Sequence, residues 1–204
     1  MTALENGKLL AGSPDHKEIA LTFDDGPKPG AIEPLVAELN RLGIKATFFL
    51  VGQQVKEFPE LAKMIHESGH EIANHSYTHP NLTKISLDDA EKELVDADME
   101  MRALTGSPVI YWRPPGGNYN TQVLDRARKH KYVCVLWTIN TADYLRPGKD
   151  KIERLVIDKA TPGGIVLAHS GVQDTVDALE KIVKELTAQG YKFVTISEMA
   201  SKMR

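Results

Sequence analysis

The stretch IALTFDDGP, residues 19–27, decides how the rest of the chain is interpreted. Its first five residues form a short apolar run of the kind that is buried as a strand inside a sheet. Asp24 and Asp25 follow this run directly, and Gly26-Pro27 then turns the chain. An isolated Asp-Asp-Gly-Pro run is most simply a turn in which Asp bonds its own backbone. Two adjacent carboxylates at the end of a buried strand nevertheless repel each other, unless a cation or an arginine compensates their charge.

Outward from this stretch, short apolar runs alternate with amphipathic ones. Further strands are predicted over residues 46–51, 71–73, 109–112, 132–138, 165–168 and 193–196, and helices over residues 32–42, 59–68, 87–104, 122–130, 151–159 and 176–189. The clearest helix, 87–104, carries one apolar stripe, with Ser86 as a candidate N-cap and Gly106 after its end. The alternation predicts an α/β fold with a largely parallel sheet, because each parallel crossover needs a connection of helix length. A closed barrel and an open, doubly wound sheet both satisfy this pattern.

Composition excludes several classes of protein. The chain has 204 residues and a net charge of −3, whereas a nucleic-acid binder usually shows an excess of basic residues. No apolar run approaches the ~18 residues that a membrane span needs. The single cysteine, Cys134, excludes an internal disulfide, and its apolar neighbours predict that it is buried and inert. We expect one domain over residues 18–204, after an N-terminal lead-in over residues 1–17 that lacks the layout of a secretory signal.

Polar side chains gather where the predicted strands end. They occur in five segments, at residues 24–27, 74–79, 113–117, 140–144 and 169–170. In parallel α/β folds, reactive groups collect at the carboxyl ends of the strands. These segments are therefore expected to form one site.

His75 and His79 are four residues apart, so on a helical turn both imidazoles can reach one cation. The spacing alone is weak, since His66 and His70 share it although Gly69 is expected to end a helix between them. We expect His66 to be solvated and His70 to be packed at the start of a strand. If one carboxylate of the Asp pair joins His75 and His79, three protein ligands leave open positions, as in catalytic metal sites. The other carboxylate is then available as a general base.

Five segments occur in this order along the chain: TFDDG (22–26), HSYTH (75–79), RPPGG (113–117), DY (143–144) and LAH (167–169). Together, and in this order, they resemble the motifs of the polysaccharide deacetylases, which carry the NodB-homology domain of family 4 carbohydrate esterases. The resemblance covers roughly residues 18–199. It implies an irregular (β/α) barrel of about seven strands, which decides between the two architectures left open above.

The resemblance also implies a metal site and a base. Asp25, His75 and His79 would bind one divalent cation, for which Zn suits the ligands best and Co, Ni, Mn or Fe(II) would also fit. Asp24 would be the general base. Arg113 would pair with Asp24, hold it ionised and aim it.

For the leaving group, the resemblance implies that His169 is the general acid and that Asp143 supports its charged form. Leu167 would line the pocket for the acetyl methyl group. The backbone N–H of Gly116 is expected to stabilise the oxyanion, because that task does not depend on a side chain. Gly116 stands where the family usually has an aromatic residue and Tyr144 where Trp is common, so the substrate-binding walls are expected to differ from the family pattern. Asn140 occupies a position that is often Asp.

The expected activity is metal-dependent removal of N-acetyl groups from N-acetylglucosamine-type units of peptidoglycan or a chitin-like oligosaccharide. An O-acetyl ester hydrolase acting on xylan keeps the same site and remains an alternative, as does a non-catalytic glycan-binding relative. The expected partner is a polysaccharide or oligosaccharide, with no nucleic acid and no membrane span, and the chain is expected to be a monomer. The substrate suggests a location outside the cell or at the cell wall, and the sequence leaves a cytoplasmic location open.

Overall fold

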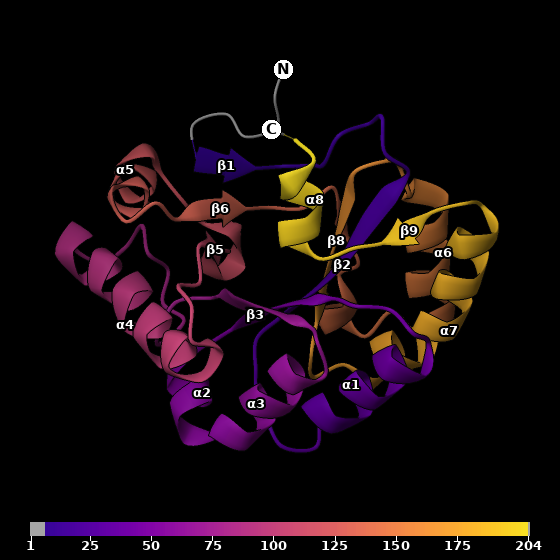
Figure 1. Cartoon of the computed structure of the whole chain (residues 1–204), viewed down its shortest axis with the longest axis horizontal. Coiled ribbons are helices and arrows are strands. Elements are labelled where there is room, and N and C mark those ends of the chain that lie inside the picture. Colours follow the sequence, from indigo (N-terminus) through magenta and orange to yellow (C-terminus); the bar gives the residue numbers. More distant parts are fainter. Residues whose placement is uncertain (1–6, 204) are drawn as a thin grey trace.

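Nine parallel strands form one curled sheet in the computed structural model, which describes residues 7–203. Eight of them lie in the order β1-β6-β5-β4-β3-β2-β8-β7, and β9 pairs with the amino-terminal half of β2. Within residues 7–203, β1 and β7 end this order without pairing with each other, so the curled sheet is open and forms a half-barrel. The expected single-domain, irregular (β/α) barrel is confirmed (Figure 1).

Strands and helices alternate along most of the chain. The strands are β1 Lys8–Leu9, β2 Glu18–Asp24, β3 Thr47–Leu50, β4 Glu71–Asn74, β5 Tyr111–Trp112, β6 Val133–Val135, β7 Ile139–Asn140, β8 Gly164–His169 and β9 Lys192–Phe193. The helices are α1 Ile32–Arg41, α2 Gly52–Glu57, α3 Pro59–Glu67, α4 Leu87–Thr105, α5 Thr121–Lys129, α6 Lys149–Lys159, α7 Gln173–Ala188 and α8 Ile196–Ser201. Two short 3-10 turns, η2 Pro115–Gly117 and η3 Asp143–Leu145, interrupt the loops at the carboxyl ends of the strands.

The two faces of the curled sheet carry different cores. Because side chains alternate along a strand, Ile19, Leu21 and Phe23 of β2 face one side and pack in the cluster that includes residues of α1 and α7. Ala20 faces the inside, where it belongs to a cluster with Ile196 and other residues of α8. Figure 1 shows helices α1 to α7 in an arc around the strands and α8 within that arc.

Helix α8 is anchored at the amino-terminal ends of the strands. The backbone N–H of Ile196 donates to Thr47, the first residue of β3, and Ser197 bonds to Glu71, the first residue of β4. The inside of the half-barrel is therefore filled from that end. Thr22 and Asp24, which share the inner face with Ala20, lie towards the opposite end.

Two predicted strands are wrong in part. Within residues 132–138 only Val133–Val135 form a strand, β6, which pairs with β5 and β1. The next strand, β7, begins at Ile139 and pairs with β8, at the other edge of the sheet. Residues 193–196 end in a helix: Thr195 and Glu198 form a capping box that starts α8. The helix α2 was not predicted, and β1 and β7 account for the difference between about seven and nine strands.

The remaining expectations concern burial and the N-terminal segment. Cys134 is fully buried, His66 is exposed and His70 is buried, as predicted. Within the segment expected to be a lead-in, Lys8–Leu9 pair with β6 as β1, and residues 1–6 lie outside the described residues. No helix between residues 7 and 203 combines the length and the apolar character that crossing a bilayer requires.

Candidate active site

The carboxyl ends of the strands surround one cavity of about 210 Å³. Eight of the ten sequence-predicted site residues line it: Asp24, Asp25, His75, His79, Gly116, Tyr144, Leu167 and His169. The other two, Arg113 and Asp143, are fully buried and contact Asp24 and His169 respectively. The structure thus brings together residues from five separate segments of the chain.

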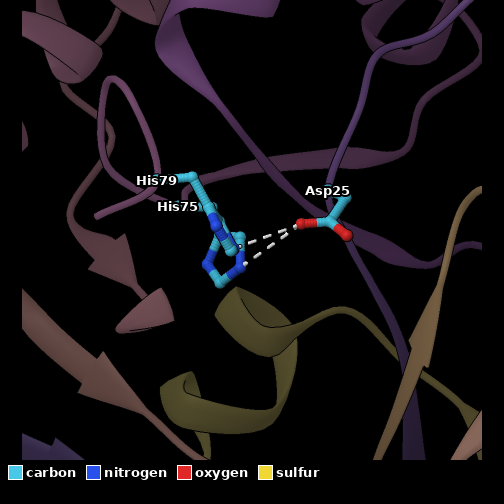
Figure 2. Close-up of side chains that lie close together, drawn as sticks. All are labelled: Asp25, His75 and His79. Carbon is cyan, nitrogen blue, oxygen red and sulfur yellow. Dashed lines mark ion pairs between the residues drawn. The ribbon is translucent and has the colours of Figure 1, made fainter. Parts of the chain in front are cut away.

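Asp25, His75 and His79 offer ligand atoms that all lie within 4.8 Å of one another. Figure 2 shows the Asp25 carboxylate directed at the two imidazoles, with its Oδ1 atom 3.8 Å from Nε2 of His75 and 3.4 Å from Nε2 of His79. The two imidazole rings meet edge to face, with centroids 4.8 Å apart. Two nitrogen donors and one carboxylate oxygen around one point form a donor set suited to a divalent transition metal.

Local backbone and hydrogen bonds fix the orientation of this triad. Asp25 has a φ of 65°, which turns it out of the strand, and its carboxylate lies near both imidazoles, whereas Asp24 pairs with Arg113. The Nδ1 atom of His75 lies 2.8 Å from the carbonyl oxygen of Arg113, which leaves Nε2 for the cavity. Burial, the largest influence on His75, lowers its pKa, and the neutral imidazole that results is the form that binds metals.

Asp24 is held by a buried arginine. Its Oδ1 atom accepts a hydrogen bond of 2.6 Å from Nη1 of Arg113, which also donates to Thr22. The rest of the guanidinium donates to the carbonyl oxygens of residues 135 and 136, and its carbon lies 4.0 Å from the centre of the Phe49 ring. The other Asp24 oxygen lies 3.7 Å from Nε2 of His75. The carboxylate is therefore fixed beside the candidate metal-ligand triad and keeps one oxygen towards the cavity.

His169 ends β8 directly beside Asp24 of the neighbouring strand β2, and it is paired with Asp143. The Nδ1 atom of His169 lies 2.7 Å from Asp143, which also accepts hydrogen bonds from the backbone N–H of His169 and the hydroxyl of Thr175. Burial lowers the pKa of His169, but the hydrogen bond and charge of Asp143, with the charges of Asp24 and Asp25, outweigh it and raise the pKa above its ordinary value. Burial alone would raise the pKa of Asp143, and these hydrogen bonds lower it. The pair thus favours a charged imidazolium that faces the cavity with Nε2.

The walls of the cavity include residues that the sequence analysis did not single out. Trp137 and Gly117 line it, and a Cβ atom on Gly117 would lie only 2.6 Å from Cη2 of Trp137. Gly117 has a φ of 72°, so a residue without a side chain suits both its conformation and this contact. Trp137 lies within the segment predicted as one strand over residues 132–138, and the break between β6 and β7 is what frees it to face the site. Asn140 also lines the cavity.

The sequence profile of the polysaccharide deacetylases matches residues 11–135. This chain belongs to the polysaccharide deacetylase family. Among curated relatives, it is 38% identical over 190 residues to a peptidoglycan-N-acetylglucosamine deacetylase of Bacillus cereus, covering 91% of this chain and 89% of that protein. It also resembles the crystal structure of a peptidoglycan N-acetylglucosamine deacetylase in complex with 4-naphthalen-1-yl-N-oxidanyl-benzamide, with a TM-score of 0.92 and 34% identity over 95% of this chain and 92% of that one.

A third match concerns a protein of the same fold. The polysaccharide deacetylase described here has a TM-score of 0.90 and 34% identity to a family 4 carbohydrate esterase pseudoenzyme from Bacillus anthracis, over 95% of this chain and 68% of that one. The fold is therefore compatible with inactive members, and the catalytic side chains carry the argument for chemistry. Family membership and its deacetylase relatives make this chain a hydrolase of the carbohydrate esterase class that acts on polysaccharide.

Proposed function

We propose that this polysaccharide deacetylase hydrolyses the N-acetyl group of N-acetylglucosamine units, with peptidoglycan as its first candidate substrate and a chitin-like oligosaccharide as its second. The observation that carries the proposal is one cavity lined by a carboxylate, a candidate metal triad and a histidine paired with a buried aspartate. Amide hydrolysis needs an activated water, a stabilised oxyanion and a proton for the leaving amine. Each of these needs has a matching group in the cavity.

Asp25, His75 and His79 are the proposed ligands of one divalent cation, with Zn the first choice. The donor set fits, because its three ligand atoms converge and His75 is neutral and oriented by Arg113. When bound, the cation supplies positive charge that polarises the acetyl carbonyl and makes a water molecule more acidic. Two imidazoles and one carboxylate leave coordination positions open for substrate and water.

Asp24 is the proposed general base. Arg113 occupies one carboxylate oxygen at 2.6 Å and leaves the other on the side of His75, where the reacting water has to lie. Three further hydrogen bonds hold the buried Arg113 guanidinium in place, so the carboxylate cannot swing away without losing its hydrogen bond to a fixed partner. Arg113 is thus a positioning residue for the base.

His169 is the proposed general acid that protonates the amine as the C–N bond breaks. Its Nδ1 atom is engaged by Asp143, so Nε2 carries the proton that the leaving group receives. The raised pKa of His169 keeps a larger fraction of this acid protonated at neutral pH than an ordinary histidine would have. The backbone N–H of Gly116 is the proposed additional donor to the oxyanion.

The cavity dimensions support a substrate of which only the acetamido group enters. A volume of about 210 Å³ is below the ~300–1,000 Å³ of pockets that enclose a drug-sized ligand. Leu167 lines the cavity as the proposed contact for the acetyl methyl, and Tyr144 forms an exposed wall with its ring edge to face against His169. The sugar chain would then lie across the rim. A wall-associated or extracellular location follows from the peptidoglycan proposal, and a monomer suffices because the cavity is complete within one chain.

Acetate release from peptidoglycan, chitooligosaccharide and acetylated xylan tests the proposal, with and without removal of metal by a chelator. We expect release from the N-acetylated glycans only in the metal-loaded protein, restored when Zn²⁺ is added back. Activity confined to xylan would establish the O-acetyl esterase instead, and glycan binding without turnover would establish a non-catalytic relative. Full activity after chelation would contradict the metal site. Comparing His169→Ala on amide and ester substrates separates the two enzymes further, because an alcohol leaves more easily than an amine.

A further inference from the structure

The loop between the two histidine ligands adopts an unfavourable backbone conformation. Ser76 has a φ of 65° and His79 a φ of 63°, in the left-handed region that residues with a Cβ atom rarely occupy. Such conformations persist only where the surrounding structure determines them. The positions of His75 and His79 relative to Asp25 therefore depend on the groups that hold this loop.

A single side chain on α4 makes three of the hydrogen bonds that hold this loop. Oε2 of Glu93 accepts hydrogen bonds from the backbone N–H groups of Tyr77 (2.8 Å) and Thr78 (2.7 Å), and Oε1 accepts one from the Thr78 hydroxyl at 2.6 Å. All three donors lie between the two histidines in the chain. Hydrogen bonds to a carboxylate are roughly twice as strong as those between neutral groups.

The other side of the loop is held by helix α2. The backbone N–H groups of Gly52 and Gln53, at the start of α2, donate to the carbonyl oxygens of Ser76 and Tyr77 at 2.9 Å each. A Cβ atom on Gly52 would lie 2.7 Å from the Tyr77 ring and 2.8 Å from the backbone of Ala97 on α4, so α2, the loop and α4 are packed without free space. The loop is thus clamped between two helices, through its carbonyl oxygens by α2 and through its N–H groups by Glu93.

Asn74 connects both the loop and α4 to the sheet through hydrogen bonds. At the end of β4, its amide nitrogen donates to the carbonyl oxygen of Leu94 on α4, and its amide oxygen accepts from the backbone N–H of Ser76. The Ser76 hydroxyl in turn accepts from the backbone N–H of His79. These neutral hydrogen bonds set the start and end of the loop, and Glu93 binds the backbone N–H groups of its middle.

We propose that Glu93 is the positioning residue of the metal centre: its carboxylate fixes the loop that spaces His75 and His79 and thereby sets the affinity for the divalent cation. The inference rests on the proposed function, because it presupposes a cation at Asp25, His75 and His79. Glu93 does not line the cavity, so it acts through the loop and not on the substrate. Groups that orient metal ligands typically change metal affinity by 10–100-fold when they are replaced.

Three substitutions separate geometry from charge. Glu93→Gln keeps both ends of the clamp, since its amide oxygen accepts from the two backbone N–H groups and its NH₂ group donates to Thr78, but it removes the charge. Glu93→Asp keeps the charge but is one methylene too short for the same contacts. Glu93→Ala removes both. Glu100→Gln is the matched control, because Glu100 lies on the same helix and pairs with Lys56 instead of the loop.

The experiment is direct titration of the metal-free proteins with Zn²⁺ by calorimetry and with Co²⁺ by visible absorption, which reports ligand geometry. Thermal unfolding of each metal-free variant ensures that the titrations are carried out where all of them are folded. We expect Glu93→Ala and Glu93→Asp to bind the metal at least about 10-fold more weakly and to show an altered Co²⁺ spectrum. Glu93→Gln should bind the metal within a few fold of the unchanged protein, and the Glu100→Gln control should bind it as the unchanged protein does.

Other outcomes overturn the inference. If Glu93→Asp keeps the affinity while Glu93→Gln and Glu93→Ala lose it equally, charge and not position is responsible. If all three variants bind as the unchanged protein does, the loop does not need the clamp. His79→Ala serves as the reference for loss of a ligand. If the unchanged protein and His79→Ala bind the metal equally, the proposed metal site itself is wrong, which distinguishes that failure from the failure of the role of Glu93.

Discussion

Replacing Asp143 by Asn tests how the candidate acid is held. Asp143 is fully buried, and its Oδ2 atom accepts from the backbone N–H of His169 at 2.8 Å and from the Thr175 hydroxyl at 2.7 Å, while Oδ1 faces Nδ1 of His169 at 2.7 Å. Asn has the same shape but only one acceptor oxygen. If that oxygen takes the place of Oδ2, the NH₂ group faces Nδ1 and meets the proton of an imidazolium. If it takes the place of Oδ1, the NH₂ group meets the backbone N–H of His169.

Both orientations disfavour the charged form of His169. The pKa of His169 is lowered by burial and raised, by a larger amount in total, by Asp143 and the nearby carboxylates. Loss of the largest opposing influence therefore lowers the pKa, and the protonated acid is lost at a lower pH than in the unchanged protein. General acid catalysis contributes about 10²–10⁴-fold, so we expect amide hydrolysis at neutral pH to fall by roughly that factor. In addition, the buried NH₂ group of the introduced Asn has no acceptor, which should lower the free energy of unfolding by about 1–3 kcal/mol.

The assay is acetate release from chitooligosaccharide as a function of pH, with an acetate ester as the second substrate. We expect the alkaline limb of the pH profile to move to lower pH and the loss to be smaller on the ester, whose leaving group needs less protonation. Asp158→Asn, at an exposed position of α6, is the control and should leave the profile unchanged. An unmoved alkaline limb in Asp143→Asn, with near-normal activity on the amide, would refute the assignment of the acid.

Three further perturbations address the base, the metal and the cavity wall. Arg113→Met leaves Asp24 buried and unpaired, so urea unfolding should show a free energy of unfolding that is about 3–5 kcal/mol lower. Adding Asp24→Asn should recover part of this loss, and equal losses in the single and double variants would argue against coupling between the two residues. Dialysis against a chelator should abolish acetate release without changing the far-ultraviolet circular dichroism, and a parallel loss of helical signal would instead indicate a structural metal. Gly117→Ala places a Cβ atom 2.6 Å from Trp137, so steady-state kinetics should show a raised KM with kcat less affected, and unchanged kinetics would mean that this wall does not contact substrate.

Most residues that line the cavity could be predicted from the sequence, because they lie at the carboxyl ends of predicted strands. Period-2 alternation in a buried strand fixes which face each side chain takes, so the polar groups that follow β2, β4 and β8 had to meet at one end of a parallel sheet. The positions of β1, β7 and α8 were not predictable in the same way. Strands of two residues, such as Lys8–Leu9 and Ile139–Asn140, are too short to show a period, and their pairing depends on curvature of the whole sheet.

The parts of the site that the sequence did not reveal act through the backbone or at a distance. Trp137 lies in a run that looks like a continuous strand, and only the change of pairing partner between β6 and β7 frees it to face the cavity. Glu93 is one of several charged residues on α4, and nothing in its spacing distinguishes it from Glu100, which forms a surface ion pair. Its contacts become visible only when the loop at residues 76–78 is placed in space.

Arg113 contacts both the proposed base, Asp24, and a proposed metal ligand, His75. Its guanidinium holds Asp24, whereas its backbone carbonyl oxygen faces Nδ1 of His75 and its backbone N–H donates to Asn74. Both sets of contacts depend on the register of β5, in which Trp112 pairs with Asn74. A shift of one residue would send the Arg113 side chain to the outer face of the sheet, away from Asp24, and would also remove the carbonyl oxygen from His75. The proposed base and one proposed metal ligand are therefore both positioned by the register of a two-residue strand. A substitution that disturbs this register should impair metal binding and the function of Asp24 together, even if every motif residue is retained.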